Sequence, residues 1–419
     1  MVQVTSSIYY TTSRVQVTIS IYWYRRPLVS AVLQAGLMWQ QSYYSSPKVK
    51  SDYQGMVVDL RSDTLTKPSK GMKDAMMKAS LGDDVYNEDP TCKELERRMA
   101  EYTGKEAALF VSSGTMGNLL SILSHCGRRG AEVLLGDQTH IFLAEQGGMA
   151  QFGGVQANNL STNPNGTFDL NEVISRIRGD DIHLPSTDLI CVENTHNKCG
   201  GKVLPQDWID QLGIVAHSMK IPLHMDGARL INAAVATGET PAKILANCDT
   251  ASVCFSKGLG TPVGSVIVGP QEFITKAHRL RKALGGGMRQ VGVLAAAALY
   301  ALDNNVDRLA EDHKHAQLLA KAVTSMQSCS VKAFSEEVHT NIFLAHLDTD
   351  IISPQKFCSR LATVSDQEVS ELGEAVVIKA NAWPGKVRMV LHHDIGSDQV
   401  EAAVAKLKYV IQEIDTQDQ

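Results

Sequence analysis

The sequence lacks the cysteine pattern of a metal site. Its eight cysteines include no C-x-x-C pair and no zinc-type spacing, and such pairs are the usual signature of structural zinc or of a redox-active disulfide. Free thiols in a reducing compartment are therefore expected. No metal site is predicted.

The sequence also lacks a long apolar run and an excess of positive charge. The longest apolar stretch, Val291 to Leu302, is far shorter than the roughly 20 residues of a membrane-spanning helix, so we interpret it as a core helix. The formal net charge is -5, which gives no general attraction to nucleic acid. We expect small molecules or further copies of the chain as partners, and neither nucleic acid nor membrane.

Acidic residues are missing from the start of the chain, where the first carboxylate is that of Asp52. Here VQVTSSIYY (Val2–Tyr10) nearly recurs as VQVTISIYW (Val15–Trp23). A Ser-rich leader without acids resembles an organelle transit peptide, although this β-rich repeat fits a presequence helix poorly. The alternatives are a non-homologous extension or a misassigned start codon, with Met56 as the natural start. We expect residues 1–54 to be a disordered extension of a cytoplasmic protein, or of a mitochondrial one if they are a transit peptide.

The remainder of the chain alternates short apolar runs with helix-length segments. Such alternation predicts an α/β fold with a mostly parallel sheet covered by helices. The runs expected to form strands are Ala107–Val111, Glu132–Gly136, Asp188–Glu193, Ile221–Asp226 and Ala251–Phe255.

The pattern changes after about residue 305, where a long polar helix, two strands and a closing helix are expected. These elements are Val306–Met326, Asn341–Leu347, Lys386–Leu391 and a helix from Ser397. A chain of 419 residues is long enough for two domains. We therefore predict a large domain over residues 55–305 and a smaller C-terminal α+β domain over residues 306–419.

Polar residues follow each predicted strand of the large domain. SSGTMGN follows the first, DQTH the second and NTHN the third; Asp226 ends the fourth, and Lys257 lies two residues past the fifth. In parallel sheets, ligands bind beyond the carboxyl ends of the strands. We therefore expect a functional site at this edge rather than a surface turn at Lys257.

Lys257 and Asp226 together favour pyridoxal phosphate. Lys257 stands in SVCFSKGLGTPVGS, where a desolvated amine suits a Schiff base and where Gly258 and Gly260 leave room for a flat ring. Asp226, in HMDGARL, could pair with a protonated ring nitrogen, as the pyridinium of this cofactor demands. The alternative for Asp226 is a solvated residue at a strand end.

A phosphate site is predicted at SSGTMGN, between a strand and a helix. Free backbone N–H groups at a helix start bind anions, although an N-cap without a ligand is the common alternative. No Gly-Lys-Ser/Thr follows, which excludes the nucleotide P-loop, and GLGTPVG departs from the dinucleotide fingerprint. One phosphate is favoured over two.

Two further residues are expected at the same edge. His140, in DQTHIFLAEQGG, could stack on a ring and use one nitrogen as a base, or it could be a satisfied core histidine. Arg229, three residues beyond Asp226, could bind a substrate carboxylate or tune the cofactor. The alternative for Arg229 is an exposed helix arginine.

Seven motifs resemble, in their order, those of the low-specificity L-threonine aldolases, also called L-allo-threonine aldolases. They are DLRSDTLTKPS, GDDVYNEDPT, SGTMGN, ENTHNKCGGKVLP, HMDGARLINA, SKGLGTPVGS and GGGMRQ, and the resemblance covers about residues 56–412. It implies the aspartate-aminotransferase-like fold (fold type I) with a mostly parallel seven-stranded sheet. It also implies pyridoxal 5'-phosphate (PLP) as the cofactor and a homodimer as the minimal unit, often a tetramer.

The resemblance further implies retro-aldol cleavage of L-threonine or L-allo-threonine between Cα and Cβ, to glycine and acetaldehyde, in threonine catabolism and glycine formation. Lys257 would carry the cofactor, Asp226 would pair with its ring nitrogen and His140 would stack on the ring. The residues implied for the phosphate are Ser113, Gly114, Thr115 and either Lys282 or Arg289, for the phosphate of the same or of the neighbouring subunit.

The substrate side is implied in the same way. Ser62, Arg229 and Arg388 would hold the amino-acid carboxylate, and His183 of DDIH, on a loop, is a second candidate besides His140 for the base. The sequence does not decide between these two histidines or between the threo and allo substrates. Two alternative hypotheses stay open. The protein could have another fold type I activity, such as transamination, β-elimination or racemisation, or it could be a cofactor-binding or structural protein without catalysis.

Overall fold

The computed structural model describes residues 6–11, 14–19 and 55–417. The chain forms two compact units, Met1–Lys50 and Ser51–Gln419. In the first unit, β1 (Ser6–Thr11) pairs antiparallel with β2 (Arg14–Ile19). Most of residues 1–54 lie outside the described residues, so the disorder predicted for this segment stays a prediction.

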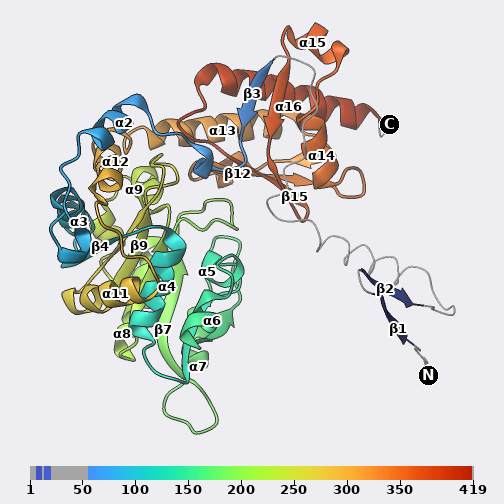
Figure 1. Ribbon diagram of the computed structural model, residues 1–419. Helices are drawn as coiled ribbons and strands as arrows, with labels where there is room; N and C mark the ends of the chain where they lie inside the picture. Colours follow the sequence, from blue (N-terminus) through green and yellow to red (C-terminus); the bar gives the residue numbers. More distant parts are fainter. Residues whose placement is uncertain (1–5, 12–13, 20–54, 418–419) are drawn as a thin grey trace. The chain divides into compact units, whose positions relative to one another are not determined.

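A seven-stranded sheet forms the centre of the large second unit (Figure 1). Its strand order is β4-β10-β9-β8-β7-β5-β6. Neighbouring strands run parallel except at β10, which is antiparallel to both β4 and β9. The predicted mostly parallel sheet is thus confirmed. The strands are β4 (Ala107–Val111), β5 (Ala131–Gly136), β6 (Gln156–Leu160), β7 (Ser186–Glu193), β8 (Leu223–Gly227), β9 (Thr250–Cys254) and β10 (Ser265–Gly269).

Helices cover both faces of this sheet because successive strand residues point to opposite sides. Leu109 and Val111 of β4 pack in one cluster with α4 and α11, whereas Ala108 and Phe110 pack in another with α3 and α12. The first face carries α4 (Gly114–His125), α5 (His140–Leu143), α6 (Gly148–Gly153) and α11 (Gln271–Ala283). The second carries α3 (Pro90–Thr103), α8 (Gln206–Ser218), α9 (Leu230–Thr237) and α12 (Gly292–Asn304).

The apolar run Val291–Leu302 is confirmed as a core helix, α12. Its buried face consists of small residues, including Ala295, Ala297 and Ala301, so the helix can pack closely against α2 (Lys70–Met77) and α3. Among the helices of the described residues, none has the length and apolar character needed to cross a membrane. All eight cysteines are free, as predicted.

The chain beyond α12 builds a second hydrophobic core, of the α+β type that was predicted. A four-stranded antiparallel sheet, in the order β11-β12-β15-β14, packs with two long helices. These elements are α13 (Leu309–Met326), β11 (Val331–Lys332), β12 (Ile342–Leu347), α14 (Pro354–Leu361), α15 (Asp366–Leu372), β14 (Asn381–Trp383), β15 (Lys386–Val390) and α16 (Ser397–Gln417).

The start of the large unit also belongs to this second core. β3 (Met56–Asp59) runs parallel to β13 (Val376–Lys379), and Val58 and Leu60 are buried among the C-terminal residues. The C-terminal elements therefore hold the segment that carries the DLRSDT motif. Hydrogen bonds between Asp63 and Arg229, described below, place this segment next to the carboxyl end of β8.

Candidate active site

The strand ends that the sequence singled out meet at one edge of the central sheet. Glu193 at the end of β7 is paired in register with Asp226 of β8, which is in turn paired with Ser252 of β9. Ser265, the first residue of β10, lies opposite both Cys254 and Val111, the last residues of β9 and β4. The loop that carries Lys257 and the start of α4 consequently leave the sheet at this same edge.

Asp226 is a buried carboxylate, not a solvated strand end. Its side chain is almost wholly inaccessible, its Oδ2 accepts a hydrogen bond from Asn118 Nδ2 (3.0 Å), and its Oδ1 accepts one from the Ala228 N–H (3.1 Å). Burial and the Glu193 carboxylate raise the pKa of Asp226, and the positive charges of Lys257 and His140 oppose that rise. A cation placed against Asp226 would therefore be strongly favoured.

Lys257 is half-buried beside this carboxylate. Among the described residues, none forms a hydrogen bond or an ion pair with its amine. The glycines that follow lie against side chains of the chain itself, and the room for a flat ring beside them stays a prediction. A Cβ at Gly258 would lie 2.9 Å from Leu309 Cδ2, and one at Gly260 (φ +76°) would collide with the His393 ring. Both glycines therefore make room for C-terminal side chains.

The start of α4 has the features of an anion site. The Oγ of the N-cap Ser113 accepts from the Met116 N–H at 3.1 Å, and the first N–H groups of a helix, here those of Gly114 and Thr115, have no intrahelical partner. A Cβ at Gly114 would lie 2.6 Å from Cys254 Sγ, so glycine lets the helix start lie against the end of β9. One phosphate group fits this arrangement.

His140, the first residue of α5, is fixed by two carboxylates. Its backbone N–H donates to Glu193 Oε2 (2.6 Å), and its ring Nδ1 lies 2.9 Å from Glu145 Oε1. Burial alone would lower the pKa of His140, but Glu145 and Asp226 outweigh burial and raise it. With Nδ1 bound to Glu145, Nε2 is the ring nitrogen left for chemistry.

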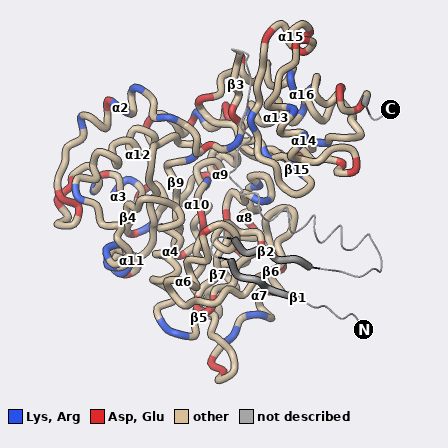
Figure 2. Tube along the Cα trace, turned by 45° about the vertical axis from the view of Figure 1, so that its right-hand side comes forward, with Lys and Arg blue, Asp and Glu red and all other residues tan. Residues whose placement is uncertain are grey.

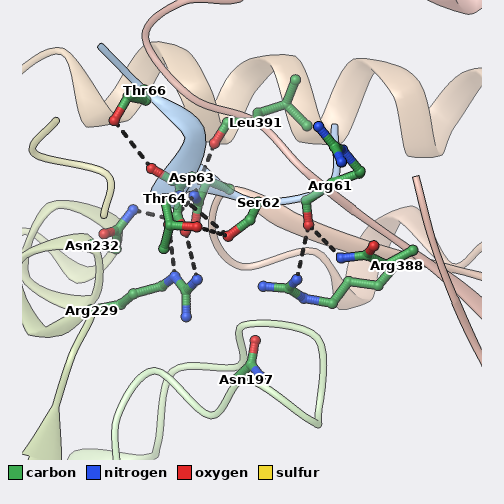
Figure 3. Close-up of polar contacts among 12 residues, drawn as sticks. Arg61, Ser62, Asp63, Thr64, Thr66, Asn197, Arg229, Asn232, Arg388 and Leu391 are labelled. Atoms are coloured by element: carbon green, nitrogen blue, oxygen red, sulfur yellow. Dashed lines mark hydrogen bonds and ion pairs between the residues drawn. The ribbon is translucent and has the colours of Figure 1, made fainter. Parts of the chain in front are cut away.

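Arg229 and Arg388 approach the DLRSDT segment from opposite sides (Figure 3). Arg229 Nε and Nη2 donate to the two oxygens of Asp63 at 2.8 and 2.7 Å, and both side chains are buried, so Arg229 is not an exposed helix arginine. Arg388 Nη1 donates to the Arg61 carbonyl at 3.2 Å. Ser62 lies between the two arginines (Figure 3), where its Oγ accepts from the Thr64 N–H at 3.2 Å.

His183 lies near the amino end of β7, whereas the other site residues lie at the carboxyl ends of the strands. It is exposed, and its N–H donates to Asp181 Oδ1 (2.7 Å) in the loop before β7. From the start of β7 to Glu193 at its end, eight residues span about 23 Å at ~3.3 Å per residue. Within one chain, the structure does not bring His183 to His140.

Lys282 and Arg289 are exposed and lie on either side of Gly286 in the sequence. Positive residues gather along α11, whose last turn carries Lys282 (Figure 2). A Cβ at Gly286, just beyond that turn, would lie 2.6 Å from Met116 Sδ, which places this loop beside the first turn of α4. Arg289 forms an ion pair with Asp83 (2.9 Å).

Sequence reasoning missed the buried polar residues that hold these groups. They lie inside the motifs that we quoted, yet we gave them no role, because their partners become visible only in three dimensions. The missed residues are Asp63 in DLRSDT, Asn118 in SGTMGN, Glu145 in AEQGG, Glu193 in ENTHN and His224 in HMDG.

Solved structures share this fold. The threonine aldolase of Leishmania major superposes with a TM-score of 0.68 at 19% identity, over 84% of this chain and 99% of that one. A structure of SPT with PLP superposes with a TM-score of 0.63 at 16% identity, over 92% of this chain and 97% of that one. The fold is therefore that of the PLP enzymes of fold type I, as the resemblance implied.

Curated relatives are more similar in sequence. A probable low-specificity L-threonine aldolase of Arabidopsis thaliana is 47% identical, over 82% of this chain and 94% of that protein. The alanine racemase TOXG of Cochliobolus carbonum is 34% identical, over 83% of this chain and 85% of that protein. A family model described as beta-eliminating lyase matches residues 59–349. The chain belongs to the beta-eliminating lyase family, and its relatives include proteins named low-specificity L-threonine aldolase.

Proposed function

We propose that the protein is a PLP-dependent aldolase that cleaves L-threonine and L-allo-threonine between Cα and Cβ to glycine and acetaldehyde. The observation that carries this proposal is the meeting of a buried carboxylate, Asp226, and a lysine amine, Lys257, at the sheet edge where α4 begins. Relatives named threonine aldolases, which match most of the chain, support the substrate.

The residues at this edge fit PLP. Asp226 is a buried carboxylate that needs a cation, and a protonated ring nitrogen supplies one. The amine of Lys257 has no hydrogen-bonded partner among the described residues. The first amides of α4, from Gly114 and Thr115, suit the phosphate. When bound, PLP supplies an electron sink for the bond that breaks.

The two buried arginines would hold the substrate carboxylate. Asp63 accepts hydrogen bonds from Nε and Nη2 of Arg229. Nη1 of Arg229 is therefore left as the donor for a ligand. Arg388 lies on the other side of Ser62 (Figure 3), with its guanidinium 5.3 Å from the centre of the Trp383 ring. Two fixed cations orient a carboxylate more strictly than one, because each hydrogen bond restricts a different rotation of the substrate.

His140 is the base that one chain can supply for the β-hydroxyl proton. Its Nδ1 faces Glu145, so its Nε2 accepts the proton, and the Glu145 carboxylate stabilises the imidazolium that results. His183 lies at the opposite edge of the sheet in the same chain. It could serve only a site of another subunit.

A homo-oligomer with a dimer as its minimal unit is also part of the proposal. In such an assembly, the exposed Lys282, Arg289 and His183 would be available to the site of a neighbouring subunit. The cytoplasmic or mitochondrial location stays a prediction.

Racemisation is the second candidate, because one relative is the alanine racemase TOXG. Lys257 and Asp226 would serve both reactions. The test incubates the PLP-loaded protein with both L-threonine diastereomers, with D-threonine as the control, and with L-alanine. Acetaldehyde from the L-substrates alone is expected. D-alanine formation without acetaldehyde would establish the racemase, and failure to bind PLP would overturn both candidates.

A further inference from the structure

A buried chain of hydrogen bonds leads from Asp226 to residues without an assigned role. Asn118 Nδ2, on α4, donates to Asp226 Oδ2 (3.0 Å) and also to Glu145 Oε1 (2.9 Å). Asn118 Oδ1 lies 3.2 Å from His224 Nε2, and His224 Nδ1 lies 2.9 Å from Thr250 Oγ1. Asn118, His224 and Thr250 are all buried, so water does not compete for these contacts.

The direction of each hydrogen bond in this chain follows from the two carboxylates. Carboxylate oxygens accept, so the Asn118 amide must face Asp226 and Glu145 with its Nδ2. Its Oδ1 then faces His224, which must carry a proton on Nε2. Burial lowers the pKa of His224 to about 3, so the ring is neutral and Nε2–H is its one proton. His224 Nδ1 accepts from the Thr250 hydroxyl.

Glycine at position 117 lets Asn118 reach these partners. A Cβ at Gly117 would collide with Ser252 Oγ of β9, so a larger residue would push the start of α4 away from the sheet. The close packing brings the next residue, Asn118, against β8, which carries both His224 and Asp226.

We propose that Asn118 and His224 are positioning residues, which keep the Asp226 carboxylate ionised and aimed at the ring nitrogen of the cofactor. This inference rests on the proposed function. Burial and Glu193 work against an ionised Asp226, and the donors found for its oxygens are the Asn118 amide and the Ala228 N–H. His224 contributes by holding the Asn118 amide in the orientation that presents Nδ2, since a flipped amide would turn Oδ1 toward the carboxylates.

The experiment compares two cofactors that differ at the ring nitrogen. The affinity of the cofactor-free protein is measured for PLP and for 1-deaza-PLP, in which a C–H group replaces that nitrogen. Asn118→Ala and His224→Phe should each weaken PLP binding by about tenfold, the effect of one hydrogen bond to a charged group, and leave 1-deaza-PLP binding unchanged. His224→Gln, which keeps a donor toward Asn118, should restore most of the PLP affinity.

Ser121→Ala is the matched control, because Ser121 is a buried residue of the same helix whose hydroxyl donates to the Gly117 carbonyl (2.8 Å), outside the chain from Asp226. It should bind both cofactors like the wild type. If Asn118→Ala does not fold, as judged by thermal unfolding, Asn118→Ser takes its place.

An equal loss of affinity for both cofactors would show a merely structural role and overturn the inference, as would unchanged PLP affinity in both variants. In either case the wild type would still bind PLP, so the proposed function would stand. A wild type that binds neither cofactor would instead overturn the proposed function, and the inference with it.

Discussion

At the scale of single residues, the site depends on buried pairs rather than on exposed charges. Lys257, Asp226 and His140 could be named from the sequence because each lies at the end of a predicted strand or shortly after it. Asp63 could not be given its role, because its partner Arg229 is 166 residues away. Which of these residues act on substrate stays a prediction.

Asp63→Asn should destabilise the protein strongly. The Arg229–Asp63 pair is buried on both sides, and loss of one charge from such a pair costs about 3–5 kcal/mol. Chemical denaturation measures this difference. Asp303→Asn, in the partly exposed pair with Arg98, is the control and should cost about 1 kcal/mol or less. Equal effects of the two substitutions would contradict the importance given to burial.

The contribution of Asp63 should also depend on pH. Burial opposes ionisation, but Arg229 prevails and lowers the pKa of Asp63. A carboxyl whose pKa is lower in the folded state stabilises the fold above its unfolded pKa of about 4, and that stabilisation is lost as the pH falls further. The difference between wild type and Asp63→Asn should therefore shrink in acid.

Glu145→Gln should move the pH profile of the reaction. Glu145 raises the pKa of His140, and a base must be unprotonated, so activity falls as the pH drops through that pKa. Removal of the negative charge should shift this acid limb of kcat/KM to lower pH. Glu172→Gln, in an ion pair with Arg176, is the control. An acid limb that does not move would exclude His140 as the base.

At the scale of elements, apolar runs predicted five of the seven central strands. The sequence did not predict the other two, β6 and β10, for physical reasons. β6 is an edge strand with the polar sequence QANNL, so it offers no apolar run. β10 follows β9 through a loop without a helix and runs antiparallel, which breaks the strand–helix alternation on which the prediction relied.

Gly117→Ala tests the packing of α4 on β9. Because the added Cβ would meet Ser252 Oγ, we expect a loss of about 1–3 kcal/mol, typical of overpacking, measured by thermal unfolding. Gly179→Ala, where a Cβ meets no atom within 4 Å, should have little effect. A second substitution, Ser252→Ala, should recover part of the loss; no recovery would mean that the strain lies elsewhere.

At the scale of the whole molecule, the sequence predicted the fold class and the α+β character of the C-terminal part. It did not predict that residues before the first motif would join that part. β3 pairs with β13 across more than 300 positions of the chain, and no local pattern specifies such a partner. The division at residue 305 stays a prediction.

This arrangement makes the site depend on both cores. Asp63, which follows β3, binds Arg229 at the start of α9 and accepts from Asn341 Nδ2 at 3.1 Å, just before β12. The candidate carboxylate site is therefore assembled from the N-terminal segment, the large sheet and the C-terminal sheet, and it forms only when all three have folded together.

The most direct test of the account is the release of acetaldehyde from L-allo-threonine by the PLP-loaded protein and by its Lys257→Ala variant. The wild type should release acetaldehyde and glycine in equal amounts, and Lys257→Ala should release neither. Lys332→Ala, an exposed lysine of β11 outside the site, controls for the loss of a charge and should retain measurable activity. Acetaldehyde release at the wild-type rate by Lys257→Ala, or none by the wild type, would contradict the account.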